Sequence, residues 1–268
     1  MLSKGTVLFD NFFERLMINM QKRTAAIVLA AGRGTRMGTD TPKQYMDIGG
    51  YPLIYYSLKA FSDSFVDEIV LVCSEGDVEY VTSDIVDRYG FFKVRSVVRG
   101  GSERYHSVYN GLTALRCGAE GERREPCDIV FIHDGARPFV NGDIIKRTYD
   151  GAVKYGAVTA AVPAKDTIRL ADTDGFTVET LRRDLLWQIQ TPQVFDFYSI
   201  YEAYSRLTES MDEVKSRGIS VTDDAMVLEL FSEKRVKTVM GDYRNIKVTT
   251  PEDVDMVKHL LFTTDRAV

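Results

Sequence analysis

The chain has 268 residues, of which 44% are hydrophobic and 27% charged, and its formal net charge is −5. This length and composition fit one large α/β domain or two small ones, with ample apolar surface for a core. The mild negative charge excludes bulk attraction to nucleic acid or to an anionic membrane, so neither is an expected partner and any phosphate ligand must meet a local basic site.

The cysteines and the apolar runs narrow the class of protein further. Cys73, Cys117 and Cys127 are an odd number and form no Cys-x-x-Cys pair, which disfavours a disulfide framework and a zinc site and indicates a reducing compartment. The longest apolar runs are strand-sized, far short of the ~20 residues of a membrane helix. We therefore expect a cytoplasmic protein without a membrane span.

The first 23 residues are expected to be an N-terminal extension, disordered or dispensable. Asp10, Asn11, Glu14 and Arg15 interrupt its apolar residues, so it lacks the uninterrupted core of a signal peptide. An early start codon, with Met20 as the natural start, is the alternative. The domain proper is then predicted over residues 24–262.

Continuous apolar runs predict strands that are buried on both faces, and amphipathic segments between them predict helices. The predicted strands are 25–31, 68–73, 93–98, 128–133 and 157–162, and the predicted helices are 52–62, 77–89, 102–116 and 142–155. Strands that alternate with helices of this length are typical of βαβ units. The sequence therefore predicts an α/β fold with a mostly parallel, Rossmann-like sheet flanked by helices.

The alternation breaks after Pro163. Residues 166–170 and 176–181 are strand-like and flank an Asp-Gly pair at 174–175, which predicts a β-hairpin. This segment is expected to leave the sheet as an arm over about 166–188. The pattern then predicts helices at 196–207 and 222–231, a strand at 236–240 and a closing helix at 251–261.

A glycine-rich, basic loop follows the first predicted strand. Open parallel sheets bind ligands at the carboxyl ends of their strands, which is where this loop lies. It combines glycines that allow close backbone approach with cations that complement a triphosphate: Gly32, Gly34, Gly38, Arg33, Arg36 and Lys43. The spacing fits neither the Rossmann G-x-G-x-x-G fingerprint nor a P-loop, so it disfavours a dehydrogenase.

The loop resembles the signature of the sugar-phosphate nucleotidyltransferases, in which Leu-Ala-Ala-Gly-x-Gly-x-Arg-Met precedes Pro-Lys-Gln-Tyr. Among them it is most similar to the 2-C-methyl-D-erythritol 4-phosphate cytidylyltransferases of the non-mevalonate isoprenoid pathway. The resemblance covers residues 24–262. Six further motifs carry it in order: Gly-Gly-Ser-Glu-Arg-Tyr-His-Ser-Val at 100–108, His-Asp-Gly-Ala-Arg-Pro at 133–138, Lys-Asp-Thr at 165–167, Leu-Trp-Gln-Ile-Gln-Thr-Pro-Gln at 186–193, Thr-Asp-Asp-Ala at 222–225 and Asn-Ile-Lys-Val-Thr at 245–249.

The resemblance implies transfer of a cytidylyl group from CTP, with release of pyrophosphate and with Mg²⁺ or another divalent cation as cofactor. Arg36 and Lys43 would be the catalytic residues, which grip the triphosphate and stabilise transition-state charge. Gly101, Ser102 and Ser107 resemble the turn that recognises cytosine, although some relatives carry aspartate where this chain has Ser102. The implied nucleotide-binding residues are Ala30, Ala31, Gly32, Gly34, Arg36, Lys43, Gly101, Ser102, Ser107 and Asp134.

The second substrate, a small sugar- or polyol-phosphate, is implied to bind on the other side of the site. The residues assigned to it are Asp134, Arg137, Thr167, Arg183, Thr191 and Lys247. Asp134 is also a candidate Mg²⁺ ligand, because the charge of a triphosphate must be offset. A structural ion pair between Asp134 and Arg137 is the alternative reading of that motif, and Lys247 is expected in a short strand.

The arm is expected to complete the active site of a homodimer. An isolated two-stranded ribbon is only marginally stable, so it must pack on something, and a partner's identical ribbon is a natural choice. By resemblance, Thr167 and Arg183 reach the partner's substrate, with Arg182 as a competitor for the second role. Ribitol-5-phosphate as the acceptor, and a catalytically idle nucleotide-binding protein, remain as alternative functions.

Overall fold

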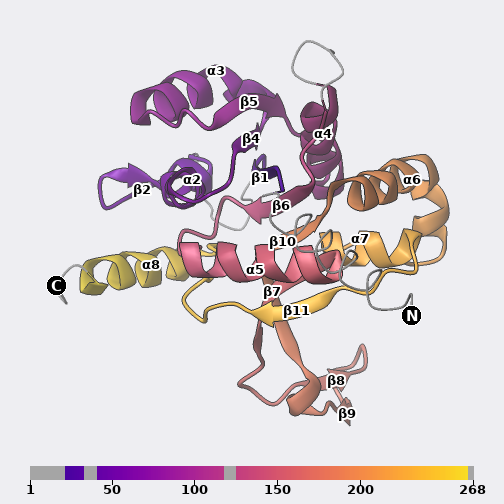
Figure 1. Cartoon of the computed structure of the whole chain (residues 1–268). Helices are drawn as coiled ribbons and strands as arrows, with labels where there is room; N and C mark the ends of the chain where they lie inside the picture. The colour runs from indigo at the N-terminus through magenta and orange to yellow at the C-terminus, as the bar shows by residue number, and fades with distance from the viewer. Residues whose placement is uncertain (1–21, 33–40, 118–124, 265–268) are drawn as a thin grey trace, which may run out of the picture.

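Seven strands form the central sheet: β1 (Thr24–Ala30), β4 (Glu68–Cys73), β5 (Val94–Arg99), β6 (Ile129–Asp134), β7 (Ala157–Pro163), β10 (Trp187–Asp196) and β11 (Lys237–Met240). Their order is β11-β7-β10-β6-β1-β4-β5 (Figure 1). Strand β10 runs antiparallel to β6 and β7, and the other pairs are parallel. The computed structural model describes residues 22–32, 41–117 and 125–264. The predicted α/β fold is confirmed.

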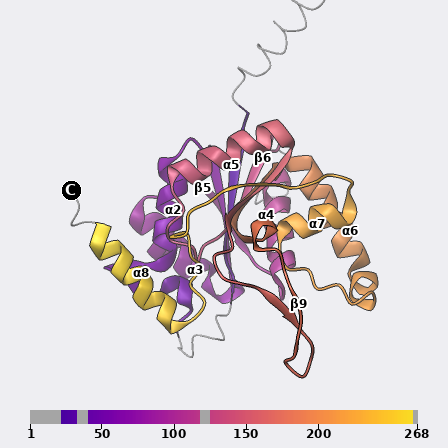
Figure 2. The same cartoon turned by 90° about the horizontal axis from the view of Figure 1, so that it is seen from below.

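Helices cover both faces of this sheet. On one face lie α2 (Leu53–Asp63), α3 (Val78–Tyr80) with the π-helical η4 (Val81–Asp87), and α5 (Gly142–Tyr155). On the other lie α4 (Arg104–Cys117), α6 (Phe197–Ser216) and α7 (Asp224–Phe231). Figure 2 shows α2, α3 and α8 (Pro251–Thr264) on one side of the molecule and α6 and α7 on the other.

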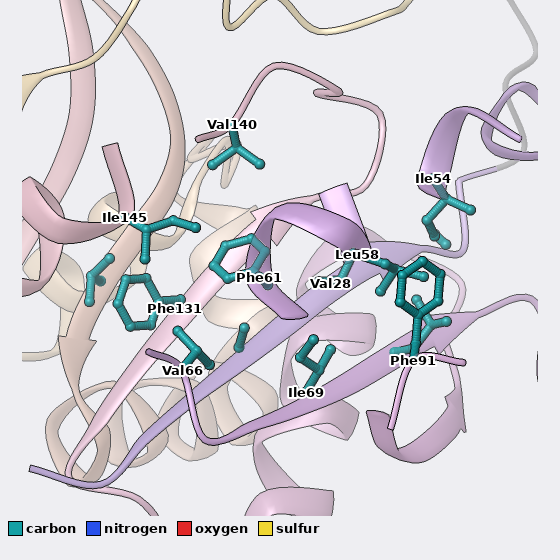
Figure 3. Packing of buried hydrophobic residues seen from close by; sticks show 14 of the residues in the cluster. Val28, Ile54, Leu58, Phe61, Val66, Ile69, Phe91, Phe131, Val140 and Ile145 are labelled. Carbon is teal, nitrogen blue, oxygen red and sulfur yellow. The ribbon is translucent and has the colours of Figure 1, made fainter. Parts of the chain in front are cut away.

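Packing on both faces of the sheet explains why the strands appear in the sequence as unbroken apolar runs. Successive side chains of a strand point to opposite faces, so in β1 Val28 packs toward α2 and α5 while Ile27 packs toward α4. Figure 3 shows the first of these layers, where the rings of Phe61 and Phe131 meet edge to face with centroids 5.9 Å apart. A strand covered on both faces needs apolar residues at every position.

Short elements join these layers. The two-residue strands β2 (Asp47–Ile48) and β3 (Tyr51–Pro52) pair antiparallel. Ile48 of β2 packs with Leu53 of α2 and with Val254 and Val257 of α8 in a small separate core. The described residues also include three single 3₁₀ turns: η2 (Lys43–Tyr45), η3 (Glu75–Asp77) and η5 (Arg183–Leu185). The sequence did not predict β2 and β3, because two-residue strands carry no periodic pattern.

Strand β10 is the main element that sequence reasoning missed. It lies in the middle of the sheet, yet it contains Gln190, Thr191, Pro192 and Gln193, and a proline argues against a central strand. The pairing of β10 with β7 shifts register between Ile189 and Gln193, so the proline lies in an irregular stretch that does not need its N–H. This irregularity also turns polar side chains toward the ends of neighbouring strands.

The predicted arm is a hairpin of β8 (Arg169–Ala171) and β9 (Thr177–Thr180), which projects from the body of the molecule (Figure 1). Gly175 adopts a φ of 86° in its turn, as the Asp-Gly signal requires. The strands are shorter than predicted, and their pairing shifts register between Leu170 and Ala171.

Helix α6 continues nine residues beyond the predicted end at Leu207. Its backbone is non-helical at Ser210, whose hydroxyl donates to the Arg206 carbonyl at 2.7 Å, a back-bond that bends helices. Val214 is buried beyond this kink and packs in the same core cluster as Leu207 before it. The predicted helix at 77–89 is present, with π-type hydrogen bonding over 81–87.

No helix in the described part of the chain is long and apolar enough to cross a bilayer. Cys73, Cys117 and Cys127 are all free thiols, in agreement with the absence of a disulfide framework.

We predict that Gly111→Ala destabilises the protein, although alanine is normally the better helix residue. A Cβ at Gly111 of α4 would lie 2.7 Å from Cγ2 of Ile27 and 3.2 Å from Cγ2 of Val72, so the helix would be pushed from the sheet. Such overpacking costs about 1–3 kcal/mol in the free energy of unfolding, measured by urea denaturation. Gly142→Ala in α5, where the added Cβ meets nothing within 4 Å, is the control and should be neutral or stabilising. Equal stability of the two variants would contradict this packing.

Candidate active site

A cavity of about 360 Å³ opens at the carboxyl ends of β1 and β6, the edge where open α/β sheets bind ligands. Its walls come from the ends of β1 and β6, the segments that follow β1 and β5, the start of α4 and the loop before α8. The lining residues are Leu29, Ala30, Ala31, Gly32, Lys43, Gln44, Gly101, Ser102, Glu103, Arg104, Ser107, Asp134, Ala136 and Lys247.

The glycine-rich segment and Lys43 form one wall of this cavity. Gln44 is buried and donates to the Ala30 carbonyl at 2.7 Å, which ties the turn at Lys43–Tyr45 to the end of β1. Lys43 donates to the Val248 carbonyl at 2.8 Å and so bridges toward the loop before α8. Gly34 and Arg36 lie outside the described residues, so their expected positions are not part of this geometry.

The turn after β5 forms a second wall. The Gly101 N–H donates to the Ser107 hydroxyl at 3.1 Å, and that hydroxyl donates to the Glu103 carbonyl at 3.3 Å. Ser107 therefore fixes the turn from the first turn of α4. The Ser102 hydroxyl lies 3.1 Å from Nδ1 of His106, one helical turn away.

Asp134, the last residue of β6, lies among three cations. Its carboxylate oxygens are 2.8 Å from Nζ of Lys247, 3.6 Å from Nε of Arg104 and 3.6 Å from Nε of Arg137. Burial would raise the pKa of Asp134, but Arg104, Lys247 and Arg137 outweigh it and hold the pKa well below its ordinary range. The Asp134–Arg137 ion pair considered from sequence is present, as one of three.

A buried hydrogen-bond chain fixes the end of β6. The Thr191 hydroxyl accepts the Asp134 N–H at 3.1 Å and lies 3.0 Å from Nδ1 of His133, whose Nε2 lies 3.3 Å from the Arg137 carbonyl. Burial lowers the pKa of His133 to about 3, so the ring is neutral. A neutral ring that donates from Nε2 accepts at Nδ1, and Thr191 then both donates and accepts. His133 is a core residue, as expected.

Lys247 lies in the loop between β11 and α8, so the predicted strand at this position is wrong. Side-chain hydrogen bonds hold this loop in place of the backbone pairing of a strand. Asn245 donates to the Thr191 carbonyl at 2.8 Å, and Gln190 donates to the Asp242 carbonyl at 2.8 Å. Arg137 donates to the Asn245 carbonyl at 2.8 Å. The Lys247 side chain is 37% exposed, and its partner is Asp134.

Arg104 is a site residue to which the sequence analysis assigned no role, although it belongs to the motif that begins at Gly100. Its guanidinium makes two 2.7 Å hydrogen bonds to the fully buried Asp224, which also accepts from the Tyr204 hydroxyl at 2.5 Å. Burial would lower the pKa of Arg104, but Asp224 holds it well above the ordinary value. The available signal was that Arg104 and Asp224 belong to two of the motifs that carry the family resemblance.

Thr167 and Arg183 do not join this cavity in their own chain. Both lie on the arm and are exposed, and Arg183 donates to the Lys165 carbonyl at 3.2 Å. The structure therefore brings together Lys43, Gly101, Ser102, Ser107, Asp134 and Lys247, with Arg137 and Thr191 directly behind Asp134.

The described residues contain no group of three or more histidine, cysteine or acidic side chains that could hold a metal ion by themselves. Among the residues that the structure describes, Asp134 is the one carboxylate found both at the cavity wall and at a strand end. This donor set fits Mg²⁺, which keeps several waters and is bound by one or two carboxylates together with substrate phosphates.

Comparison with known proteins points to one family. Residues 24–262 match the family model for IspD, 2-C-methyl-D-erythritol 4-phosphate cytidylyltransferase. Relatives of that description from Clostridium beijerinckii and Lachnospira eligens are 45% and 47% identical, over 88% and 86% of this chain and 97% and 96% of theirs. The crystal structure of 4-diphosphocytidyl-2C-methyl-D-erythritol synthase from Anaerococcus prevotii superposes with a TM-score of 0.75 at 34% identity, covering 90% of this chain and 96% of that one.

We predict that Asp134→Asn lowers the free energy of unfolding at pH 7 by about 2–3 kcal/mol, because three cations lose their shared partner while Lys247 stays partly solvated. The folded-state pKa of Asp134 is depressed, so its contribution is complete above the unfolded pKa near 4 and is lost as the pH falls below it. The difference between wild type and variant should therefore narrow by about 1.4 kcal/mol per pH unit below that value.

Urea denaturation at pH 7, 5 and 3 measures this difference. Asp63→Asn is the matched control, since Asp63 pairs with Lys59 on an exposed helix surface, where such pairs contribute about 0.3–0.5 kcal/mol. A difference for Asp134→Asn that stays constant from pH 7 to pH 3 would show that the carboxylate charge does not stabilise the site.

Proposed function

The chain belongs to the 2-C-methyl-D-erythritol 4-phosphate cytidylyltransferase family, and from this membership we propose how its own residues perform the family's reaction. The protein is a CTP-dependent enzyme that makes CDP-methylerythritol for non-mevalonate isoprenoid synthesis. Methylerythritol phosphate is thus the acceptor, and ribitol phosphate and an idle nucleotide-binding role are set aside.

The reaction needs positioning and charge neutralisation more than a covalent intermediate. A phosphate oxygen of methylerythritol phosphate attacks the α-phosphorus of CTP, and the bond from that phosphorus to the bridging oxygen breaks. Pyrophosphate leaves and takes the electron pair of that bond. The observation that supports this assignment is the cavity itself, where Lys43 and Lys247 line the same space at the sheet edge.

We assign the triphosphate to the wall formed by Gly32 and Lys43. Backbone N–H groups near Gly32 can approach phosphate oxygens closely, and a lysine ammonium carries three N–H donors. Arg36 is assigned to the same task on its sequence motif, with Gly34 beside it. Arg36 and Lys43 would stabilise the charge that develops on the α-phosphate in the transition state.

We assign the nucleobase to the opposite wall, where Gly101, Ser102 and Ser107 face Ala30 and Ala31. This wall joins apolar contact area to short polar groups, as a pyrimidine requires.

The acceptor is assigned to Asp134, Arg137, Thr191 and Lys247. Lys247 and Arg137 would bind its phosphate, and Asp134 would orient them and contact a hydroxyl. Asp134 would also hold Mg²⁺ together with triphosphate oxygens. When bound, the ion neutralises phosphate charge.

A homodimer is proposed to complete each site. The arm exposes Phe176 by 73%, Val178 by 70% and, in η5, Leu185 by 66%, which is an unusual amount of apolar surface for so small a segment. A second copy of the same ribbon would cover these side chains. Thr167 and Arg183 would then contact the acceptor bound to the partner subunit, in keeping with their absence from the cavity of their own chain.

We predict Mg²⁺-dependent pyrophosphate release from CTP with methylerythritol phosphate, and different defects on the two sides of the cavity. Lys43→Ala should lower kcat about 100-fold or more, because Lys43 acts on charge that develops in the transition state. Lys247→Ala should chiefly raise KM for methylerythritol phosphate.

Steady-state kinetics with each substrate varied in turn measures both effects, and Lys258→Ala on the exposed side of α8 is the control. Near-normal kcat for Lys43→Ala would show that the triphosphate assignment is wrong. Faster turnover with ribitol phosphate than with methylerythritol phosphate would contradict the acceptor.

The shared site predicts complementation between two inactive variants. Lys43→Ala and Arg183→Ala subunits, mixed and allowed to exchange, should recover about a quarter of wild-type activity, because half of the dimers are mixed and each has one intact site of two. Recovery is measured as pyrophosphate release, and exchange is verified with differently tagged subunits. Absence of recovery despite exchange would contradict shared sites, and a monomer by sedimentation would contradict the dimer.

A further inference from the structure

The turn at Gly101 and Ser102 is held by two adjacent side chains of α4, and one of them has no role in the proposed reaction. Ser107 anchors the backbone through the Gly101 N–H, at 3.1 Å. His106 packs directly over Gly101, since a Cβ at Gly101 would collide with the Cβ of His106. Nδ1 of His106 lies 3.1 Å from the Ser102 hydroxyl. The glycine therefore serves to bring the imidazole within hydrogen-bond distance of Ser102.

Ser102 lines the cavity, whereas His106 does not. The imidazole therefore acts on a ligand only through the serine. The part of the cavity that Ser102 faces is also the part left for a base, because Lys43 and Gly32 mark the phosphate side and Lys247 and Asp134 the acceptor side.

A serine hydroxyl by itself distinguishes poorly between the two pyrimidine nucleotides. It can donate one hydrogen and accept at its oxygen. Cytosine presents an amino group, a donor, at the position where uracil presents a carbonyl, an acceptor. A freely rotating hydroxyl would therefore satisfy either base, by accepting from cytosine or by donating to uracil.

We propose that His106 is a specificity-determining residue that makes Ser102 an acceptor only. In this arrangement Nδ1 of His106 accepts the Ser102 proton, so the hydroxyl oxygen presents only lone pairs to the cavity. It then accepts from the cytosine amino group, while a uracil carbonyl would meet a second acceptor and lose its hydrogen bond. The proposal rests on the proposed function, in particular on the base lying at Gly101 and Ser102.

The same logic accounts for the chemistry of Ser102 itself. A carboxylate is an acceptor only, so an aspartate at this position would need no helper. The serine of this chain requires one, and His106, one helical turn further along α4, is placed to supply it.

Competition between CTP and UTP at equal concentration tests this proposal. The ratio of the two products gives the ratio of their kcat/KM values, even for a slow variant. His106→Ala should lower the CTP preference about tenfold, the equivalent of one hydrogen bond. The double variant Ser102→Asp with His106→Ala should return the preference to at least the wild-type level, because a carboxylate cannot donate. His259→Ala, an exposed histidine of α8, should leave it unchanged.

The double variant separates proton orientation from structural support. If His106 merely packed the turn, its loss would lower activity with both nucleotides. Any accompanying change in the ratio of CTP to UTP products would then not be reversed by Ser102→Asp. An unchanged ratio in His106→Ala, or a double variant as unselective as His106→Ala, would overturn the proposal. Wild-type enzyme that fails to prefer CTP would instead contradict the proposed function, so the two failures are distinguishable.

Discussion

The carboxylate of Asp134 is the group on which the geometry of this site depends. A cavity built for two phosphate-bearing substrates must concentrate cations, and cations without a counter-charge repel one another. Asp134 lies at the end of a fully buried strand and meets Arg104, Arg137 and Lys247, each from a different segment. One negative charge thus keeps three cations close together before any substrate arrives, so their reorganisation is not needed during the reaction.

Hydrogen bonds from neighbouring segments hold Asp134 and its surroundings in place. Thr191 binds its N–H, the neutral His133 binds Thr191, and Asn245 ties the Lys247 loop to the Thr191 carbonyl. All of these contacts involve Thr191, which lies in the irregular part of β10. In a regular strand, the backbone groups of this stretch would form ladder hydrogen bonds with the neighbouring strands. The irregularity in the sheet is therefore what makes polar side chains available at the site.

This arrangement also explains what could and could not be predicted from the sequence. The parallel strands were predictable because burial on both faces leaves an apolar run, as in β1, and the glycine loop and Asp134 were found because they follow such runs. Strand β10 was missed because its Gln-Thr-Pro-Gln stretch serves the site instead of the core. The partners of Lys247 and the bidentate pair of Arg104 with Asp224 are contacts between distant segments, 113 and 120 residues apart in the chain, on which local patterns give no information.

The pair of Arg104 with Asp224 shows how a chain of net charge −5 can still present a cationic site. Asp224, Arg104, Asp134 and Lys247 form a row of alternating charges that runs from the buried start of α7 to the partly exposed loop before α8. Desolvation of the inner members is offset by the two-fold hydrogen bonding of Arg104 and by the Tyr204 hydroxyl. Because the row ends on Lys247, its exposed terminus is positive and faces the cavity with Lys43. A phosphate in the cavity therefore interacts mainly with the charges that line the cavity, because the distant surface charges are screened by solvent and salt. The order of the charges in the row determines that the charge facing this phosphate is positive.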